Sequence, residues 1–205
     1  MGQINKLLVP IGDKPLIVRS FRTIIATPIK RVFVILGHEA ERVKQTLQSY
    51  MISMQVDRQS VHFIVNPAYQ EGLSYSLRCG LNALPDAVGG FMVYLADMPF
   101  VSSRVIETLI EAFECFDGEK ICVPVTDHKR GNPILWPVRF RDEMKAIQGD
   151  KGARLLLDHH PEAVYEVTVD DPGILIDVDT PTCLARLCSK YTTIVSNDSN
   201  DQRPL

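Results

Sequence analysis

The chain has 205 residues, of which 45% are hydrophobic and 23% are charged, values that suit one globular domain with a substantial buried core. The net charge of -3 argues against a nucleic-acid-binding surface, which would show as an excess of basic residues. No apolar run is long enough to cross a bilayer and the first residues do not resemble a signal peptide, so we expect no membrane partner. The five cysteines are scattered without a CxxC pair, which favours a reducing, cytoplasmic location.

Short β-branched runs alternate with longer amphipathic stretches, a pattern typical of an α/β protein. In chain order, we expect a strand over 31–37, a helix over 39–54, a strand over 61–65, a helix over 73–84, a strand over 90–96, a helix from Ser102 or Ser103 to Phe116, a strand over 120–125, a loop over 126–133, helices over 137–147 and 152–159, strands over 165–169 and 174–178, and a helix over 181–190. We therefore expect one domain over residues 1–190 and a disordered tail over 191–205, which ends in an Asn-, Asp- and Ser-rich stretch.

Acidic residues stand at the ends of two predicted strands. Asp97 directly follows an apolar strand, where a carboxylate is costly unless it is compensated, and Mg²⁺ is a suitable partner. Asp177 and Asp179 would point to the same face of their strand, where their mutual repulsion favours a cation. Asp97 and Asp179 have a second interpretation, because each also precedes a predicted helix and could cap it.

Two other regions are suited to anions. Gly72 frees the backbone before a predicted helix, and Ser74 and Ser76 offer hydroxyls near its N-terminus, although serines there are often only caps. Basic residues beside glycines over 129–133 and 149–154 suit phosphate contacts, with an exposed, solvated loop as the simpler alternative.

Taken together, these clusters resemble the molybdenum cofactor cytidylyltransferases, a family within the MobA-like nucleotidyltransferases. The resemblance runs from Asn5 to about Lys190. Its matching pieces are Asn5-Lys6-Leu7-Leu8 with Pro10, Gly12 and Pro15; Asn66-Pro67 with Gly72, Ser76 and Gly80; Asp97-Met98-Pro99; Gly131-Asn132-Pro133; Gly149-Asp150-Lys151-Gly152-Ala153-Arg154; and Asp177-Val178-Asp179-Thr180-Pro181. The last two pieces are the most specific to the family.

The resemblance implies an α/β fold of the three-layer, nucleotide-diphospho-sugar-transferase-like (Rossmann-like) kind with a mostly parallel sheet. It implies transfer of CMP from CTP to molybdopterin (the molybdenum cofactor) with release of pyrophosphate, Mg²⁺ as cofactor, and a molybdenum hydroxylase or its chaperone as a protein partner. It assigns catalysis to Lys6 and Asp97, and the metal to Asp97, Asp177 and Asp179. It places Lys6, Asn66, Gly72, Ser76 and Asp97 at the nucleotide, and Arg130, Asn132 and Arg154 at the acceptor.

The chain departs from the family pattern at its start. Family members open with a strand and a loop close to Leu-Ala-Ala-Gly-x-Ser-x-Arg-Met-Gly, and here Met1-Gly2 stands in place of the final pair. We therefore expect the central first strand and the phosphate-binding glycines to be missing, through a misassigned or shortened start or in a degenerate relative. Loss of a central strand exposes unpaired backbone groups, which predicts poor stability, oligomerisation through the gap or inactivity.

Three other functions compete with this interpretation. The same sheet and acidic residues serve sugar-phosphate and methylerythritol cytidylyltransferases. A guanylyltransferase is the second alternative, because the missing loop carries much of the choice of base. The third is an inactive relative that binds the molybdenum cofactor and delivers it to a hydroxylase.

Overall fold

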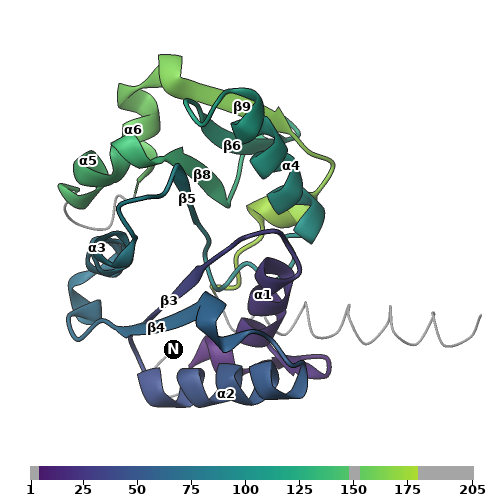
Figure 1. Ribbon diagram of the computed structural model, residues 1–205. Helices are drawn as coiled ribbons and strands as arrows, with labels where there is room; N and C mark the ends of the chain where they lie inside the picture. Colours follow the sequence, from purple (N-terminus) through teal and green to yellow (C-terminus); the bar gives the residue numbers. More distant parts are fainter. Residues whose placement is uncertain (1–4, 148–152, 180–205) are drawn as a thin grey trace, which may run out of the picture.

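The computed structural model describes residues 5–147 and 153–179, which form helices and strands in alternation (Figure 1). The α-helices are α1 (Leu16–Ile25), α2 (Ala40–Ser53), α3 (Leu73–Ala83), α4 (Ser103–Cys115), α5 (Arg141–Lys145) and α6 (Arg154–His159). The strands are β1 (Pro10–Ile11), β2 (Lys14–Pro15), β3 (Val32–Leu36), β4 (Val61–Val65), β5 (Gly90–Val93), β6 (Ile121–Thr126), β7 (Lys129–Arg130), β8 (Ile134–Pro137) and β9 (Val164–Thr168). The predicted α/β class is confirmed. The predicted helix over 181–190 and the domain boundary at 190/191 lie outside the described residues.

The strands form two main sheets. In the first, β3 pairs parallel with β4, so that Val32 lies opposite Val61. In the second, β5 pairs antiparallel with β8, β8 with β6, and β6 with β7, while β9 runs parallel to β6. The short strands β1 and β2 form a separate hairpin near the start of the chain.

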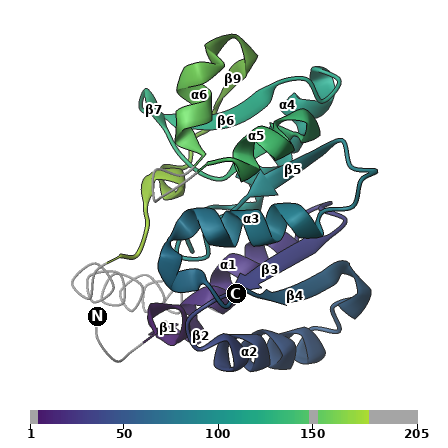
Figure 2. The ribbon, with the colours of Figure 1, turned by 90° about the vertical axis from the view of Figure 1, so that its left-hand side faces the viewer.

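Helices cover both faces of these sheets. Figures 1 and 2 show α3, α5 and α6 on one face and α1, α2 and α4 on the other. Because side chains alternate along a strand, β6 contributes buried side chains to the hydrophobic core on both faces of its sheet. Ile121 and Val123 pack in the cluster that contains Trp136, whereas Cys122, between them, packs with Leu109 of α4.

A cavity of about 1590 Å³ separates the two sheets. It is lined by residues from 29–38, which include β3, and by residues from 87–96, which include β5. In the described part of the chain these two strands are not hydrogen-bonded to each other as neighbours. The absence of a central first strand, expected from the family resemblance, stays a prediction.

Several local predictions differ from the structure. The strand predicted over 174–178 is wrong, because residues Pro172–Leu175 form a 3-10 helix and the chain then continues irregularly. The loop predicted over 126–133 contains β7. Helix α1 and strand β8 were not predicted.

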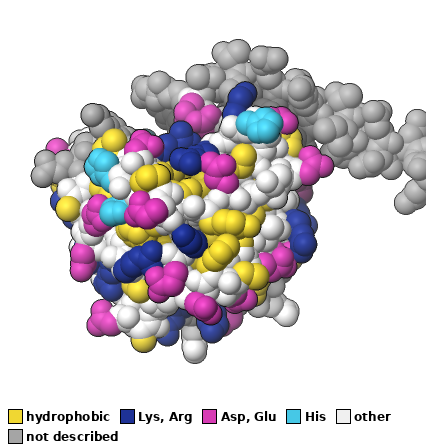
Figure 3. Space-filling model, turned by 90° about the horizontal axis from the view of Figure 1, so that it is seen from above, with side chains coloured by type: hydrophobic (Ala, Val, Ile, Leu, Met, Phe, Trp, Pro, Cys, Tyr) yellow, Lys and Arg dark blue, Asp and Glu magenta, His cyan; other side chains and the backbone are white. Residues whose placement is uncertain are grey.

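The described residues contain no helix with both the length and the apolar composition required to cross a bilayer. On the face seen in Figure 3, acidic and basic side chains are intermixed with small apolar areas, and no continuous basic patch covers that face.

Candidate active site

Lys6 lies in a short 3-10 helix that Asn5 fixes in place. The Asn5 side-chain oxygen accepts a hydrogen bond from the Leu7 backbone N–H (3.1 Å), and its Nδ2 donates to the His38 carbonyl (3.1 Å). Asn5 is itself buried, with 9% of its surface exposed. One side chain thus ties the turn that carries Lys6 to the end of β3.

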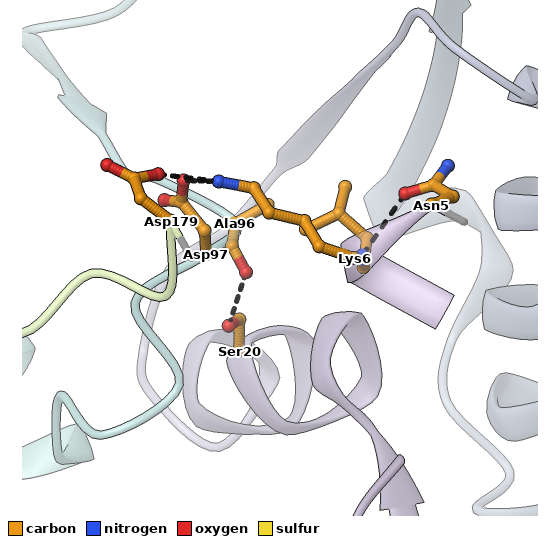
Figure 4. Close-up of polar contacts among 7 residues, drawn as sticks. Asn5, Lys6, Ser20, Ala96, Asp97 and Asp179 are labelled. Atoms are coloured by element: carbon orange, nitrogen blue, oxygen red, sulfur yellow. Dashed lines mark hydrogen bonds and ion pairs between the residues drawn. The ribbon is translucent and has the colours of Figure 1, made fainter. Parts of the chain in front are cut away.

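The Lys6 ammonium bridges two carboxylates that are far apart in the sequence (Figure 4). Its Nζ donates to Asp97 Oδ2 at 2.8 Å and to Asp179 Oδ1 at 2.7 Å. Partial burial alone would lower the pKa of Lys6, but the hydrogen bonds to Asp179 and Asp97 and the attraction of both charges outweigh it and raise the pKa. The ammonium therefore stays protonated at neutral pH.

Asp97 is held at the carboxyl end of β5 by contacts to its backbone. The Ser20 hydroxyl of α1 donates to the Ala96 carbonyl at 2.7 Å, and the Val178 N–H donates to the Asp97 carbonyl at 2.9 Å. The second contact brings the segment that carries Asp179 alongside Asp97. Helix α4 has Ser102 at its N-cap position, so the alternative in which Asp97 caps this helix is wrong.

Asp177 and Asp179 have opposite pKa shifts. Burial is the largest cause that raises the pKa of Asp177, and the hydrogen bond and charge of Asp179 add to it. The hydrogen bond from Lys6 is the largest cause that lowers the pKa of Asp179. The two aspartates therefore interact with each other. They lie in an irregular segment and not in the predicted strand.

The Asp97–Asp179 pair fits a hard divalent cation. Among residues 5–147 and 153–179, no three acidic, histidine or cysteine side chains are arranged to hold a metal between them. Mg²⁺ does not need such a cage, because it is commonly held by one or two carboxylates, with water and substrate phosphates completing its shell. Asp97 and Asp179 already hold a cation, the Lys6 ammonium, between their carboxylates, and Asp177 lies next to Asp179 in the same cluster.

The predicted nucleotide residues Asn66 and Ser76 contact each other. Asn66 is 2% exposed, and its Nδ2 donates to the Ser76 hydroxyl at 3.0 Å while its Oδ1 accepts from the Ala68 N–H. Gly72, at the N-cap position of α3, has a φ of 107°, which side-chain-bearing residues rarely adopt. Gly72 stands at the N-cap position, and no side chain caps the start of α3 by a hydrogen bond. The interpretation of Ser74 and Ser76 as caps is therefore wrong.

The predicted acceptor residues Arg130, Asn132 and Arg154 line the large cavity, together with Ser76 and Asp177. Arg130 donates from Nε to Glu166 Oε1 at 2.7 Å, a contact between half-exposed side chains. The Asn132 backbone N–H donates to the Ile174 carbonyl, and the peptide bond before Pro133 is cis. The cavity therefore brings residues from both halves of the chain to one space.

Two residues that shape the site were not predicted from the sequence. Asn5 was named only within a matching piece, and Ser20 carried no prediction. Ser20 is 1% exposed, and because α1 also contains Arg19, Arg22 and Thr23, a polar residue in this helix is not a distinctive signal.

The two sheets between helical layers, with a lysine and acidic residues beyond the end of β5, define an α/β domain of the Rossmann-like type. The chain belongs to the family of the MobA-like NTP transferase domain, which matches residues 1–164. The predicted membership of the MobA-like nucleotidyltransferases is confirmed.

Several known proteins resemble the chain. Nicotine blue oxidoreductase from Paenarthrobacter nicotinovorans is 24% identical over 200 residues, covering 91% of this chain and 89% of that protein. The 2-C-methyl-D-erythritol 4-phosphate cytidylyltransferase of Bacillus cereus is 28% identical over 167 residues, covering 78% and 69%. The chain also matches bifunctional GlmU proteins, such as that of Synechococcus sp. (strain JA-3-3Ab), of whose length it spans only 16%.

Solved structures show the same fold. An Rv0371c homologue from Mycobacterium sp. strain JC1 superposes with a TM-score of 0.77 at 23% identity, covering 93% of this chain and 90% of that one. Rv0371c from Mycobacterium tuberculosis H37Rv, in a complex with manganese, gives a TM-score of 0.72 at 22% identity, with coverage of 92% and 93%.

Proposed function

We propose that the protein is a cytoplasmic nucleotidyltransferase that transfers CMP from CTP to the terminal phosphate of molybdopterin. The observation that carries the proposal is the Lys6 ammonium held between Asp97 and Asp179 at the carboxyl end of a strand. In open α/β sheets this is the edge at which ligands bind. Membership of the MobA-like NTP transferase domain family supports a nucleoside triphosphate as donor.

The reaction needs positioning and charge neutralisation more than a protein base, because the attacking phosphate is already anionic. An oxygen of the acceptor phosphate forms a bond to the α-phosphorus, the bond from that phosphorus to the bridging oxygen breaks, and pyrophosphate leaves with the electron pair. Lys6 would neutralise charge on the triphosphate. Mg²⁺, when bound by Asp97 and Asp179, would supply further neutralisation of the same charge.

The remaining residues would bind the two substrates. Asn66, Gly72 and Ser76 would position the nucleotide, and the buried Asn66–Ser76 hydrogen bond supports a prearranged polar surface there. Arg130, Asn132 and Arg154 would contact the acceptor. Arg130 would then have to exchange its contact with Glu166 for one with the acceptor phosphate. The protein would then deliver the product to a molybdenum hydroxylase or its chaperone.

A pyrophosphate-release assay tests this function. Molybdopterin, Mg²⁺ and each of the four nucleoside triphosphates are supplied to the 205-residue chain and to a form extended by an N-terminal strand and glycine-rich loop. We expect release with CTP, and a loss of at least about 100-fold in Asp97→Asn. The matched control is Asp86→Asn, because Asp86 is a fully exposed carboxylate that pairs with Arg141.

Each other outcome contradicts part of the proposal. No release from either form with any nucleotide removes the transferase function, and unchanged molybdopterin binding in Asp97→Asn would then favour an inactive cofactor-binding relative. Release with GTP alone replaces the cytidylyl assignment by a guanylyl one.

A sugar- or polyol-phosphate cytidylyltransferase is the second candidate. It is favoured by the match to 2-C-methyl-D-erythritol 4-phosphate cytidylyltransferase, which covers 69% of that enzyme. The same assay with methylerythritol phosphate as acceptor separates the two, because only the correct acceptor supports CTP-dependent release.

A further inference from the structure

The Lys6 ammonium occupies the position in which two carboxylates meet. Its Nζ lies 2.8 Å from Asp97 Oδ2 and 2.7 Å from Asp179 Oδ1, and 26% of the Lys6 side chain is exposed. These are charge-assisted hydrogen bonds of good length, so the ammonium is well bound there. Any second cation that used the same two oxygen atoms would meet this charge directly.

Two cations cannot share these oxygens without a large repulsion. A divalent ion contacts a carboxylate oxygen at about 2.0–2.6 Å, which would bring it next to the Lys6 nitrogen. The turn that carries Lys6 is fixed by Asn5, but the lysine side chain itself has four flexible methylene groups. The ammonium can therefore leave while the backbone stays in place.

We propose that Lys6 and a divalent cation exclude each other at the Asp97–Asp179 pair, so that binding of the ion releases the Lys6 ammonium. Without nucleotide, Lys6 offsets one of the two negative charges of the pair and so weakens its affinity for the ion. The released ammonium becomes available to the phosphates of the donor, and this last step alone rests on the proposed function. By linkage, an anion that attracts Lys6 away tightens binding of the ion to the same extent.

Mn²⁺ binding without nucleotide tests the competition directly. Free Mn²⁺ is measured by electron paramagnetic resonance in the wild-type protein and in Lys6→Met, Lys6→Arg and Lys14→Met. We expect Lys6→Met to bind Mn²⁺ at least about tenfold more tightly, because it keeps the side-chain length and loses the charge. Lys6→Arg keeps the charge and should match the wild type, as should Lys14→Met, because Lys14 pairs with Asp13 in another part of the chain.

A double variant locates the ion. Adding Asp97→Asn to Lys6→Met should remove the gain in affinity. Equal or weaker Mn²⁺ binding by Lys6→Met overturns the proposal, and so does a gain that survives Asp97→Asn.

A second measurement needs no variant and covers the case in which Lys6→Met does not fold. Acetylation of individual lysines in the wild-type protein is followed by mass spectrometry with and without Mg²⁺. We expect Mg²⁺ to increase labelling of Lys6 several-fold and to leave Lys14 unchanged, because only Lys6 loses its carboxylate partners. Unchanged labelling of Lys6 at saturating Mg²⁺ contradicts the exclusion.

These measurements are independent of turnover. A gain in Mn²⁺ affinity in a protein that never releases pyrophosphate supports the exclusion and removes the proposed function. Active transfer without a gain in Mn²⁺ affinity supports the proposed function and overturns the exclusion.

Discussion

Asp177 and Asp179 are separated by one residue and have different surroundings. Asp179 accepts a hydrogen bond from the Lys6 ammonium, which lowers its pKa, whereas burial first and then the neighbouring charge raise the pKa of Asp177. We therefore predict that Asp179→Asn reduces kcat/KM for CTP about tenfold more than Asp177→Asn does. Pyrophosphate release at several CTP concentrations measures both variants. A greater loss in Asp177→Asn would show that Asp177 is the more important of the two carboxylates.

We expect Ser20 to position Asp97 through the backbone carbonyl of Ala96. Its buried hydroxyl donates to the Ala96 carbonyl at 2.7 Å, so Ser20→Ala removes one hydrogen bond, at a cost of about 0.5–1.5 kcal/mol. We expect kcat to fall several-fold while KM for CTP stays unchanged, and urea denaturation to show the loss of stability. The control is Thr23→Ala in the same helix, because the Thr23 hydroxyl donates only to the carbonyl one turn back. A fall in stability with kcat unchanged would leave Ser20 a purely structural role.

Residues that carry chemistry were easier to predict than residues that position them. Lys6, Asp97 and Asp179 were predicted from short matching pieces, and the structure brings all three together. The contact of Ser20 joins residues 76 positions apart through a backbone carbonyl, which leaves no trace in the sequence pattern. Asn5 acts in the same way, through the backbone of Leu7 and His38.

Elements were predictable where periodicity and surroundings agreed. The strand over 61–65 matches β4 in both bounds, and the helix over 39–54 exceeds α2 by one residue at each end. Helix α1 was missed because its sequence is rich in β-branched residues, although its buried face includes Leu16, Ile17 and Phe21. Local propensity is a weak guide in such a case, because tertiary packing decides.

Over residues 174–178 a strand was predicted and none forms. Its apolar, β-branched pattern is typical of a strand, but Asp171 caps a 3-10 helix by accepting from the Gly173 N–H. The other Asp171 oxygen accepts from the Ser102 N–H, and the Ile174 carbonyl accepts from Asn132. These contacts to irregular segments take the place of a strand ladder, and no local pattern in the sequence predicts them.

Helices α5 and α6 are joined by an ion pair that should make stability depend on pH. The hydrogen bond to Glu143 is the main cause that raises the pKa of His160. A folded-state pKa above the unfolded value means that this stabilisation is complete below about pH 6.5 and is lost as the pH rises through the folded-state value. We expect His160→Gln to lower the urea midpoint at about pH 5.5 and to leave it almost unchanged at about pH 8.5.

The neighbouring histidine provides the control. His159 is exposed at the end of the same helix, and His159→Gln should leave the urea midpoint unchanged at both pH values. An effect of His160→Gln that grows with pH would contradict the sign of the shift.

The cavity between the two sheets brings together strands from both halves of the chain. Strands β3 and β5 both line it, and in the described part of the chain each has its pairing partner on the side away from the other, β4 and β8 respectively. Backbone N–H and C=O groups along such edges favour pairing with another strand. The helical layers on both faces supply apolar side chains such as Leu77 and Ile110, which would cover an inserted strand from either side.

An apolar strand fused to the N-terminus should therefore stabilise the protein. We predict that five β-branched residues joined by a short glycine-containing loop raise the Tm by at least about 5 °C, because two hydrogen-bonded ladders and an apolar filling form at once. Thermal unfolding followed by circular dichroism gives the comparison. The control carries the same extension with prolines at two central positions, which cannot donate to a ladder and should leave the Tm near that of the 205-residue chain. If both extensions change the Tm equally, the cavity does not accept a paired strand, and its two edges are satisfied in another way.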